Sequence, residues 1–484
     1  MNAATDLLRQ SAATMAGAVR AGNVSAGALA QASFARIEAT DDRVNAFTAR
    51  TQQRALQRAA ALDAQLAAGG EAAQALRALP LLGVPFAVKN LFDIEGLPTL
   101  AGSKIEQDSP PARLDAVLVQ RLEAAGAVLV GALNMDEYAY GFTTENSHVG
   151  PARNPHDLTR IAGGSSGGSG AAVAAGQVPL TLGSDTNGSI RVPASLCGVF
   201  GLKPTFGRLP RTGSYPFVSS LDHLGPFARS ARDLALAYDA MQGPETGPVR
   251  DPGCLQRAVE PVAPLLAKNT SGLRIGVLGG YFRARATPQA LAAVDRVAAA
   301  LGAAETVELP MVQAGRAAAF LITNSEGAAL HLQDLRTRPQ DFEPLSRDRF
   351  LAGTLIPAAW TVRAQRVRRL YAESVARVFE RYDVLLAPAT PCAATPIGAE
   401  HFEIGGQRLP VRPNMGVLTQ PISCIGLPVC AVPVWGSEER RSPLPIGVQV
   451  IAAPWREDLV LRVAAALEAA GVAHAPVAEP GARA

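Results

Sequence analysis

The chain has 484 residues, of which 48% are apolar and 18% are charged, and its formal net charge is +3. This composition is typical of a globular protein with a large core, and no run of apolar residues is long enough to span a bilayer. The basic residues form no stripe along the sequence, so the charge pattern indicates no nucleic-acid partner. Residues 1–20 lack the basic and apolar segments of a signal peptide, so we expect a cytoplasmic protein.

Residues 1–70 are predicted to be helical. Ser25 is placed to cap a helix that runs to about Glu38, and an Ala- and Leu-rich helix from Arg50 ends at Gly69 and Gly70. Strands and helices then alternate, which predicts an α/β sheet with helices packed on its faces. The predicted strands are 82–88, 128–130, 179–183, 273–278, 306–309, 384–387, 429–434 and 446–451. The predicted helices are 113–125, 171–175, 287–301, 311–333, 358–381 and 457–469.

The Pro- and Gly-rich connection 243–272 is the best candidate for a domain boundary. Strands on both sides of it are compatible with one sheet, so we expect a single domain over 1–484. Within it we distinguish N-terminal helices (1–70), a catalytic core (71–242) and the rest of the sheet with a helical substrate-side region (273–484). The five cysteines form no CxxC pair, which predicts neither a disulfide framework nor a zinc site.

Residues 163–170 are almost entirely Gly and Ser. Each glycine costs conformational entropy, so such a segment needs a structural reason. A P-loop would require Lys followed by Ser or Thr after the last Gly. A dinucleotide-binding turn and a nucleophile elbow both require a strand leading into the turn, which the polar residues 154–160 do not predict. A flexible linker is a further alternative, although the Ala-rich and apolar segments that follow have the composition of interior structure.

Ser189 follows directly on a predicted strand, within the sequence Asp-Thr-Asn-Gly-Ser-Ile-Arg-Val-Pro of residues 185–193. A turn of small residues at this point directs backbone N–H groups to one place and presents the Ser189 hydroxyl. That is the geometry an oxyanion hole requires. Asp185 and Arg191 are placed to pair across the turn, and we interpret them as structural residues.

These two segments, with Lys89 placed 76 residues before Ser165, resemble the signature of the amidase-signature family. The resemblance covers nearly the whole chain and implies the amidase-signature fold, an α/β fold whose central mixed β-sheet is covered by helices on both faces. It implies that Ser189 is the nucleophile and that Ser165, on a cis peptide, passes its proton to Lys89. It also implies that no metal or organic cofactor is needed. The backbone N–H groups assigned to the oxyanion hole are those of Thr186, Asn187, Gly188 and Ser189.

The residue types fit this chemistry. A serine hydroxyl is a poor nucleophile until a base takes its proton. Lys89 ends an apolar run, and burial disfavours the charged amine, so Lys89 is suited to act as a neutral base. Without the motif, a lysine that reaches the surface from a strand end is the simpler interpretation. Ser166 and Ser169 are assigned to loop structure, and the six histidines show no spacing typical of a metal site or a catalytic dyad.

Two resemblances bear on the substrate. Residues 134–147 are similar to the A subunit of the glutamyl-tRNA amidotransferase, but Asn187 stands where that subunit has Gly, and Gly416 stands where it has a substrate-contacting Asp. Residues 135–193 and 414–421 look most like the 1-carboxybiuret hydrolase family. That resemblance implies release of ammonia from 1-carboxybiuret to give urea-1,3-dicarboxylate, in cyanuric acid degradation and nitrogen metabolism. It also implies a small helical partner resembling the amidotransferase C subunit, and we expect an oligomer.

A carboxylated substrate requires a cation in the pocket, and Arg349 is the candidate because it matches a substrate arginine of the amidotransferase subunit. A helix-surface arginine paired with a nearby acid is an equal alternative. Tyr140 and Gln420 are further pocket candidates. Three hypotheses stay open: an amidohydrolase of small polar amides, an amidotransferase subunit that works on tRNA, and a non-enzymatic scaffold. The intact serine and lysine motif speaks against the scaffold.

Overall fold

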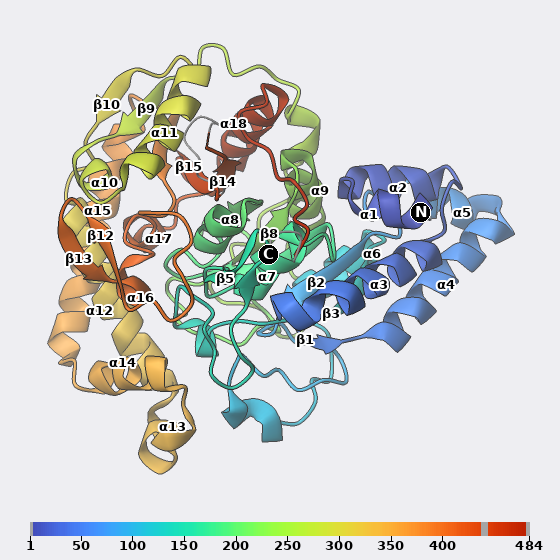
Figure 1. Ribbon diagram of the computed structural model, residues 1–484, viewed down its shortest axis with the longest axis horizontal. Helices are drawn as coiled ribbons and strands as arrows, with labels where there is room; N and C mark the ends of the chain where they lie inside the picture. Colours follow the sequence, from blue (N-terminus) through green and yellow to red (C-terminus); the bar gives the residue numbers. More distant parts are fainter. Residues whose placement is uncertain (1–2, 437–443, 481–484) are drawn as a thin grey trace.

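The structure is a computed structural model that describes residues 3–436 and 444–480, so the first two and last four residues of the predicted 1–484 domain lie outside it. Its centre is one sheet of 11 strands in the order β1-β3-β2-β6-β8-β7-β14-β15-β11-β9-β10 (Figure 1). These strands are β1 Phe47–Arg50, β2 Pro85–Lys89, β3 Val128–Leu133, β6 Leu180–Asp185, β7 Phe200–Lys203, β8 His223–Ala228, β9 Ile275–Leu278, β10 Glu305–Val307, β11 Val384–Pro388, β14 Val429–Val434 and β15 Ile446–Ala452. Strands from both sides of the 243–272 connection lie in this sheet.

The sheet is mixed, as the family resemblance implied. β2 is parallel to both β3 and β6, and β6 is antiparallel to β8. β2, β3 and β6 are buried along their whole length, which is the burial expected of parallel strands covered on both faces. Their carboxyl ends therefore meet at one edge of the sheet.

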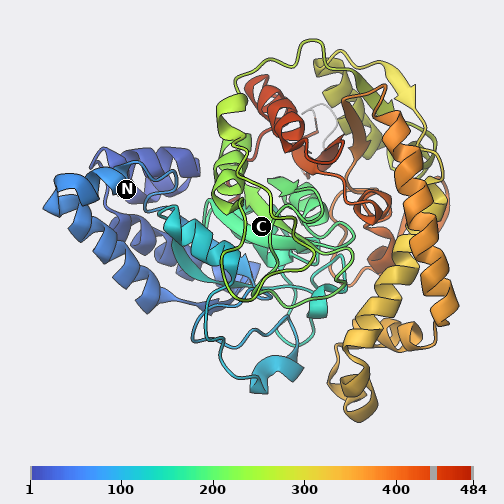
Figure 2. The ribbon, with the colours of Figure 1, turned by 180° about the vertical axis from the view of Figure 1, so that it is seen from behind.

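Helices cover both faces of the sheet. α7 packs against α8, and α9 packs against α18. α8 and α9 both contact β7, and α8 and α18 both contact β14. Figures 1 and 2 show the two helix pairs on opposite faces of these strands. The α-helices are α1 Ala3–Leu8, α2 Ala12–Arg20, α3 Ala26–Val44, α4 Gln52–Ala68, α5 Gly70–Arg77, α6 Val117–Ala124, α7 Gly167–Ala174, α8 Arg191–Cys197, α9 Ala231–Met241, α10 Gly280–Ala284, α11 Pro288–Ala300, α12 Val312–Leu330, α13 Leu332–Thr337, α14 Pro344–Thr354, α15 Ala358–Val378, α16 Val411–Asn414, α17 Gln420–Cys424 and α18 Glu457–Ala469.

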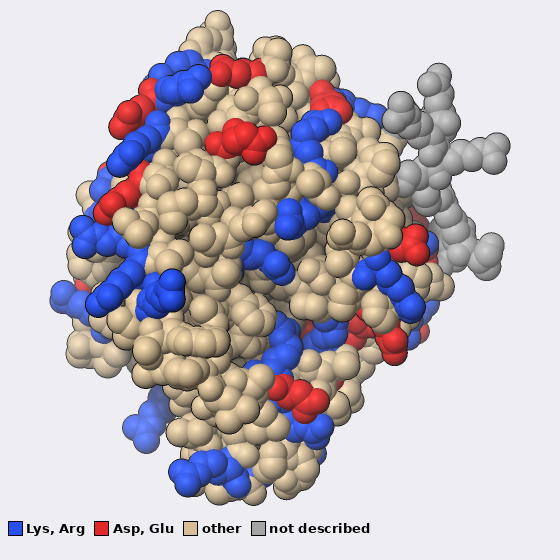
Figure 3. All heavy atoms as spheres, turned by 90° about the vertical axis from the view of Figure 1, so that its left-hand side faces the viewer, with Lys and Arg blue, Asp and Glu red and all other residues tan. Residues whose placement is uncertain are grey.

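A layer of helices lies beside the sheet, where α12 packs against α14, α15 and α17. Figure 3 shows the face of the molecule on this side, where Lys and Arg side chains are scattered among uncharged residues rather than joined into a stripe. Among the residues that the structure describes, none of the helices combines the length and apolarity needed to cross a membrane.

Several sequence predictions need correction. Ser25 does cap α3, since its Oγ accepts the Ala28 N–H at 3.0 Å, but the helix continues to Val44. The helical prediction for 1–70 is interrupted by the edge strand β1, and the helix predicted for 113–125 begins only at Val117. A hairpin of β4 (Arg153–Asn154) and β5 (Asp157–Ile161) forms where polar residues predicted no strand. It is polar because it lies outside the central sheet and is only partly buried.

Candidate active site

Lys89 is the last residue of β2, and its side chain is fully buried. β2 and β6 are parallel neighbours whose register pairs Val88 with Leu182, so the end of one strand lies beside the end of the other. Lys89 Nζ lies 2.7 Å from Ser165 Oγ and 2.9 Å from Ser184 Oγ. The contact between Lys89 and Ser165 was predicted from the motif, whereas the contact with Ser184 was not.

The surroundings of Lys89 suit a base. Burial lowers the pKa of Lys89 to about 7, although the carboxylates of Asp136, Asp222 and Asp185 act in the opposite direction. A group with a pKa near the working pH has a large neutral fraction and still binds a proton readily. The alternative of a lysine that reaches the surface is wrong, because this side chain has no exposed area.

The glycine-rich segment is packed against other parts of the interior. A Cβ on Gly164 would lie 2.1 Å from Asp136 Oδ2, and one on Gly168 would lie 2.6 Å from the carbonyl oxygen of Ala46. The peptide between Gly164 and Ser165 is cis, as the family resemblance implied. The glycines are therefore needed for close approach, and the flexible-linker interpretation is wrong.

The two serines assigned to loop structure connect α7 to β6. Ser166 Oγ donates to the carbonyl oxygen of Ser184 at 3.1 Å, and Ser169 Oγ donates to that of Leu182 at 3.0 Å. Both side chains are fully buried. Neither makes a hydrogen bond to Lys89 among the described residues, so their contacts fit a structural role.

Asp185 organises the turn that carries Ser189. Its carboxylate accepts the Gly188 N–H at 2.7 Å and the Arg191 Nε at 2.9 Å, which confirms the predicted pairing of Asp185 with Arg191. Gly188 has φ of 138°, and a Cβ there would lie 2.1 Å from Thr419 Oγ1. Only glycine fits this position, because an L side chain would be strained in φ and would also collide.

The backbone donors of the turn are not equivalent. The Gly188 N–H is not free for an oxyanion, contrary to the prediction, because the Asp185 carboxylate uses it to fold the turn. Within the described part of the chain, the N–H groups of Thr186, Asn187 and Ser189 bind no acceptor. These three remain as candidate oxyanion donors.

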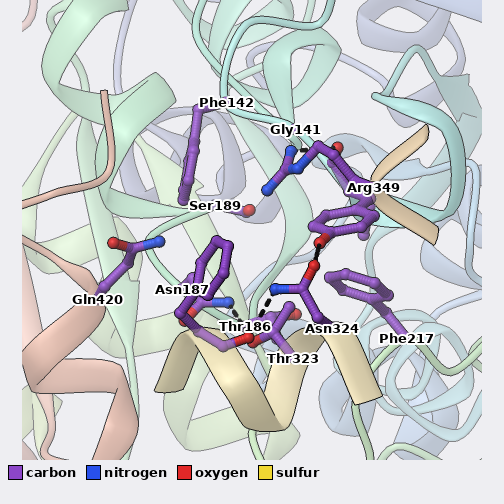
Figure 4. Close-up of a pocket in the computed structure, with 13 residues that line it drawn as sticks. Gly141, Phe142, Thr186, Asn187, Ser189, Phe217, Thr323, Asn324, Arg349 and Gln420 are labelled. Carbon is purple, nitrogen blue, oxygen red and sulfur yellow. Dashed lines mark hydrogen bonds between the residues drawn. The ribbon is translucent and has the colours of Figure 1, made fainter. Parts of the chain in front are cut away.

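Ser189 faces a small pocket that holds about 340 Å³ of empty space (Figure 4). Lys89 is hydrogen-bonded to Ser165, but among the described residues no hydrogen bond joins Ser165 to Ser189. All three predicted substrate residues, Arg349, Tyr140 and Gln420, line the pocket. The other lining residues are Ala139, Gly141, Phe142, Thr186, Asn187, Phe217, Phe320, Thr323 and Asn324.

Arg349 reaches the pocket from α14. Its guanidinium carbon lies 3.8 Å from the centre of the Tyr140 ring, and its Nη1 donates to the Tyr140 carbonyl oxygen at 3.3 Å. Figure 4 shows the guanidinium pointing toward the Ser189 hydroxyl. No carboxylate of the described residues forms an ion pair with it, so the alternative of a surface arginine paired with an acid is wrong. Arg349 is a cation held at the pocket without a charged partner.

The other two predicted substrate residues are held by side chains that the sequence did not indicate. The Tyr140 hydroxyl donates to Asn324 Oδ1, so Tyr140 presents its ring to Arg349 and keeps its hydroxyl engaged. Gln420 Oε1 accepts from Arg316 Nε at 2.9 Å, which leaves the Gln420 amide N–H groups for the pocket. Asn324 stands in a polar run of α12, residues 323–326, and nothing in that run distinguishes it from its neighbours.

Asn187 contributes a side chain as well as a backbone N–H. Its Nδ2 donates to Thr323 Oγ1 on α12 at 2.8 Å (Figure 4). Its Oδ1 is buried and has no hydrogen-bond partner within the described residues. A buried acceptor without a partner costs free energy, and this one belongs to a residue that lines the pocket.

An α/β sheet that brings a buried lysine and two serines to the end of β2 and β6, beside a pocket with free backbone donors, defines the class of serine amide hydrolases. A family model described as Amidase matches residues 28–461. The chain belongs to the amidase-signature family.

Individual relatives agree over nearly the full length. AtzE, from the 1-carboxybiuret hydrolase of Pseudomonas sp. (strain ADP), is 61% identical over 456 residues, which cover 94% of this chain and 97% of that protein. The A subunit of the glutamyl-tRNA(Gln) amidotransferase of Roseiflexus sp. (strain RS-1) is 38% identical over 474 residues, covering 92% and 93%.

Solved structures share the fold. One, described as an unexpected vestigial protein complex that reveals the evolutionary origins of an s-triazine catabolic enzyme, has a TM-score of 0.93 at 59% identity, covering 96% of this chain and 100% of that one. A 6-aminohexanoate cyclic dimer hydrolase complexed with substrate has a TM-score of 0.82 at 31% identity, covering 96% and 97%. The predicted fold and enzyme class are confirmed.

Proposed function

We propose that this enzyme hydrolyses the terminal amide of 1-carboxybiuret, giving urea-1,3-dicarboxylate and ammonia. The observation that carries the proposal is the guanidinium of Arg349, which lies beside Ser189 in a small pocket and forms no ion pair among the described residues. The 61% identity to AtzE of a 1-carboxybiuret hydrolase supports it.

In this proposal Ser189 Oγ attacks the amide carbonyl carbon while its proton passes to Ser165 and from there to Lys89. The tetrahedral oxygen is bound by backbone N–H groups of the Ser189 turn. When the C–N bond breaks, the nitrogen takes the proton and leaves as ammonia. Water then attacks the acyl-enzyme, gives its proton to the same relay and releases the carboxylate product, while Ser189 recovers its proton.

The polar groups of the pocket complement a carboxylated ureide. Arg349 supplies a cation for the carboxylate, with a fork of donors that suits its two oxygens. The Gln420 amide N–H groups suit a urea carbonyl, and the Asn187 Oδ1, which lacks a partner, suits a urea N–H. A simple aliphatic amide has no second N–H between carbonyls with which to satisfy Asn187.

The same region weighs against the amidotransferase alternative. A Cβ on Gly416 would lie 2.2 Å from Cζ of Phe142, whose ring is part of the pocket wall. The space that an Asp would need at 416 is therefore filled by Phe142.

We also propose a small helical protein as partner, which the structural neighbour described as a protein complex supports.

The proposal is tested by incubating the purified enzyme with freshly prepared 1-carboxybiuret and measuring ammonia release. We expect one ammonia for each urea-1,3-dicarboxylate formed, and slower release from glutamine or a simple aliphatic amide. A gel-shift assay with tRNA at several salt concentrations distinguishes the alternative. Tight tRNA binding together with glutamine hydrolysis would overturn the proposal.

Replacing Arg349 with methionine is expected to lower kcat/KM for the carboxylated substrate by roughly 10–10²-fold, because a charge-assisted contact contributes about 1.5–3 kcal/mol. Most of the change should be in KM, since the carboxylate lies away from the scissile bond. The matched control is Arg347→Met on the same helix, where Arg347 pairs with the exposed Asp348. Equal effects of the two substitutions would contradict the role of Arg349.

A further inference from the structure

Lys89 has a second hydroxyl neighbour that the proposed relay does not use. Ser184 lies on β6, the strand beside β2, and its side chain is buried. Its Oγ accepts from Lys89 Nζ at 2.9 Å, close to the 2.7 Å between Nζ and Ser165 Oγ. Its backbone N–H donates to Ser166 Oγ at 3.3 Å, which fixes this part of the strand against the glycine-rich turn.

We propose that Ser184 is a positioning residue for the base: it accepts an N–H of Lys89 and thereby directs the lone pair of the neutral amine toward Ser165. The inference rests on the proposed role of Lys89 in the relay.

The reason lies in the geometry of the amine. An ammonium group has three N–H donors and no lone pair, whereas the neutral amine has two N–H donors and one lone pair. The lone pair must face Ser165 for a proton to pass. If Ser165 were the only partner, rotation about the Cε–Nζ bond would let an N–H face Ser165 instead. A second acceptor at a fixed angle occupies an N–H and removes part of that freedom.

Charged groups near Lys89 do not offer this second contact. Asp136, Asp185 and Asp222 all act on Lys89 through their charge, but their carboxylates are engaged elsewhere. Asp185 binds Arg191, Asp136 accepts the Thr144 N–H, and Asp222 accepts the Thr186 hydroxyl. Among the described residues, Ser165 and Ser184 are the two hydrogen-bond partners of Lys89 Nζ.

Loss of Ser184 is expected to change two features of the pH profile: the position of its acidic limb and the maximal rate. The hydroxyl accepts more strongly from the ammonium than from the neutral amine, so its removal lowers the pKa of Lys89 further below its present value of about 7. Because the reaction needs neutral Lys89, activity rises with pH through this pKa, and the acidic limb of the profile moves to lower pH. The maximal rate falls at the same time, because the lone pair is less well directed.

The test follows the rate at which an activated phosphonate labels Ser189 between about pH 5 and 9, which requires no natural substrate. Ser184→Ala is expected to label about tenfold more slowly at the plateau and to have its acidic limb at lower pH. Ser184→Thr, which keeps the hydroxyl, should restore both the rate and the limb. Ser169→Ala removes another buried hydroxyl bonded to β6 and should leave the limb in place.

A wild-type rate and limb in Ser184→Ala would overturn the inference, and so would a slower rate with an unshifted limb, which a merely structural role would give. If Ser184→Ala lacks the wild-type circular dichroism spectrum, Ser184→Cys takes its place, because the thiol keeps the size and is a weaker acceptor. Ser184→Cys should fall between alanine and wild type, and wild-type behaviour would overturn the inference. Lys89→Met distinguishes a failure of the Ser184 inference from a failure of the proposed relay. Unchanged labelling in that variant would overturn the relay itself.

Discussion

Replacing Ser189 with alanine is expected to reduce kcat by about 10⁴–10⁶-fold, the range found when the nucleophile of a hydroxyl-based hydrolase is removed. The physical reason is that no acyl-enzyme forms, so only the pocket and the backbone donors still assist water. Ammonia release from 1-carboxybiuret measures the loss. KM should change little, because the Ser189 hydroxyl is not one of the groups proposed to recognise the substrate.

The relay predicts a particular form of non-additivity. Lys89→Met should cost about as much as Ser189→Ala, and the double variant should cost no more than either alone, since residues that act as a unit lose their effect together. Ser169→Ala is the matched control, a buried serine outside the relay. Labelling of Ser166 by an activated phosphonate while Ser189 stayed unlabelled would show that the roles are wrongly assigned.

The reacting groups could be predicted because three local segments of the sequence resemble the signature of the amidase-signature family. A strand end, a glycine-rich turn and a strand-turn motif each place one side chain, and the parallel pairing of β2 with β6 brings them together. The pairing of Asp185 with Arg191 could also be predicted, because the two residues are only six positions apart on either side of one turn.

The residues that act on the predicted ones could not be found in this way. Ser184 precedes a conspicuous motif, and nothing in a single sequence says that a strand residue contacts Lys89, 95 positions earlier. Asn324 and Thr323 come from α12, which approaches the pocket only through packing of the helical layer. The engagement of the Gly188 N–H by Asp185 depends on how the turn folds, which residue types alone do not specify.

The secondary structure likewise divides into elements that the sequence predicted and elements that it did not. Long buried strands such as β15 and periodic helices such as α11 and α18 carry their pattern locally. The edge strand β1 has four residues and one buried position, and the β4–β5 hairpin is polar. Both acquire strand geometry from a partner rather than from their own pattern, so their sequences did not distinguish them from loop or helix.

Replacing Arg191 with methionine is expected to destabilise the protein by about 3–5 kcal/mol, the cost of leaving one member of a buried ion pair without its partner. Arg191 and Asp185 are both fully buried. Arg191 also donates to Gln449 Oε1 at 2.7 Å and to the Thr419 carbonyl oxygen at 3.2 Å, so its loss leaves further acceptors unpaired. Urea unfolding measures the change. Arg369→Met, which removes an exposed pair with Glu373, should cost no more than about 1 kcal/mol.

The effect of Arg191→Met should depend on pH in a direction that identifies its cause. Burial raises the pKa of Asp185, but the Arg191 guanidinium outweighs burial in the wild type, and the net pKa lies below the ordinary value. Stability from this pair is therefore present above the unfolded pKa of Asp and is lost as pH falls toward the folded pKa. In the variant burial acts unopposed by Arg191, so Asp185 takes up a proton more readily and the destabilisation shrinks on acidification. A loss of stability equal at pH 7 and pH 4.5 would show that packing, rather than the unpaired carboxylate, is responsible. Asp185→Asn combined with Arg191→Met should recover part of the stability, because the neutral amide leaves no unpaired buried charge and its Oδ1 can still accept the Gly188 N–H that folds the turn carrying Ser189.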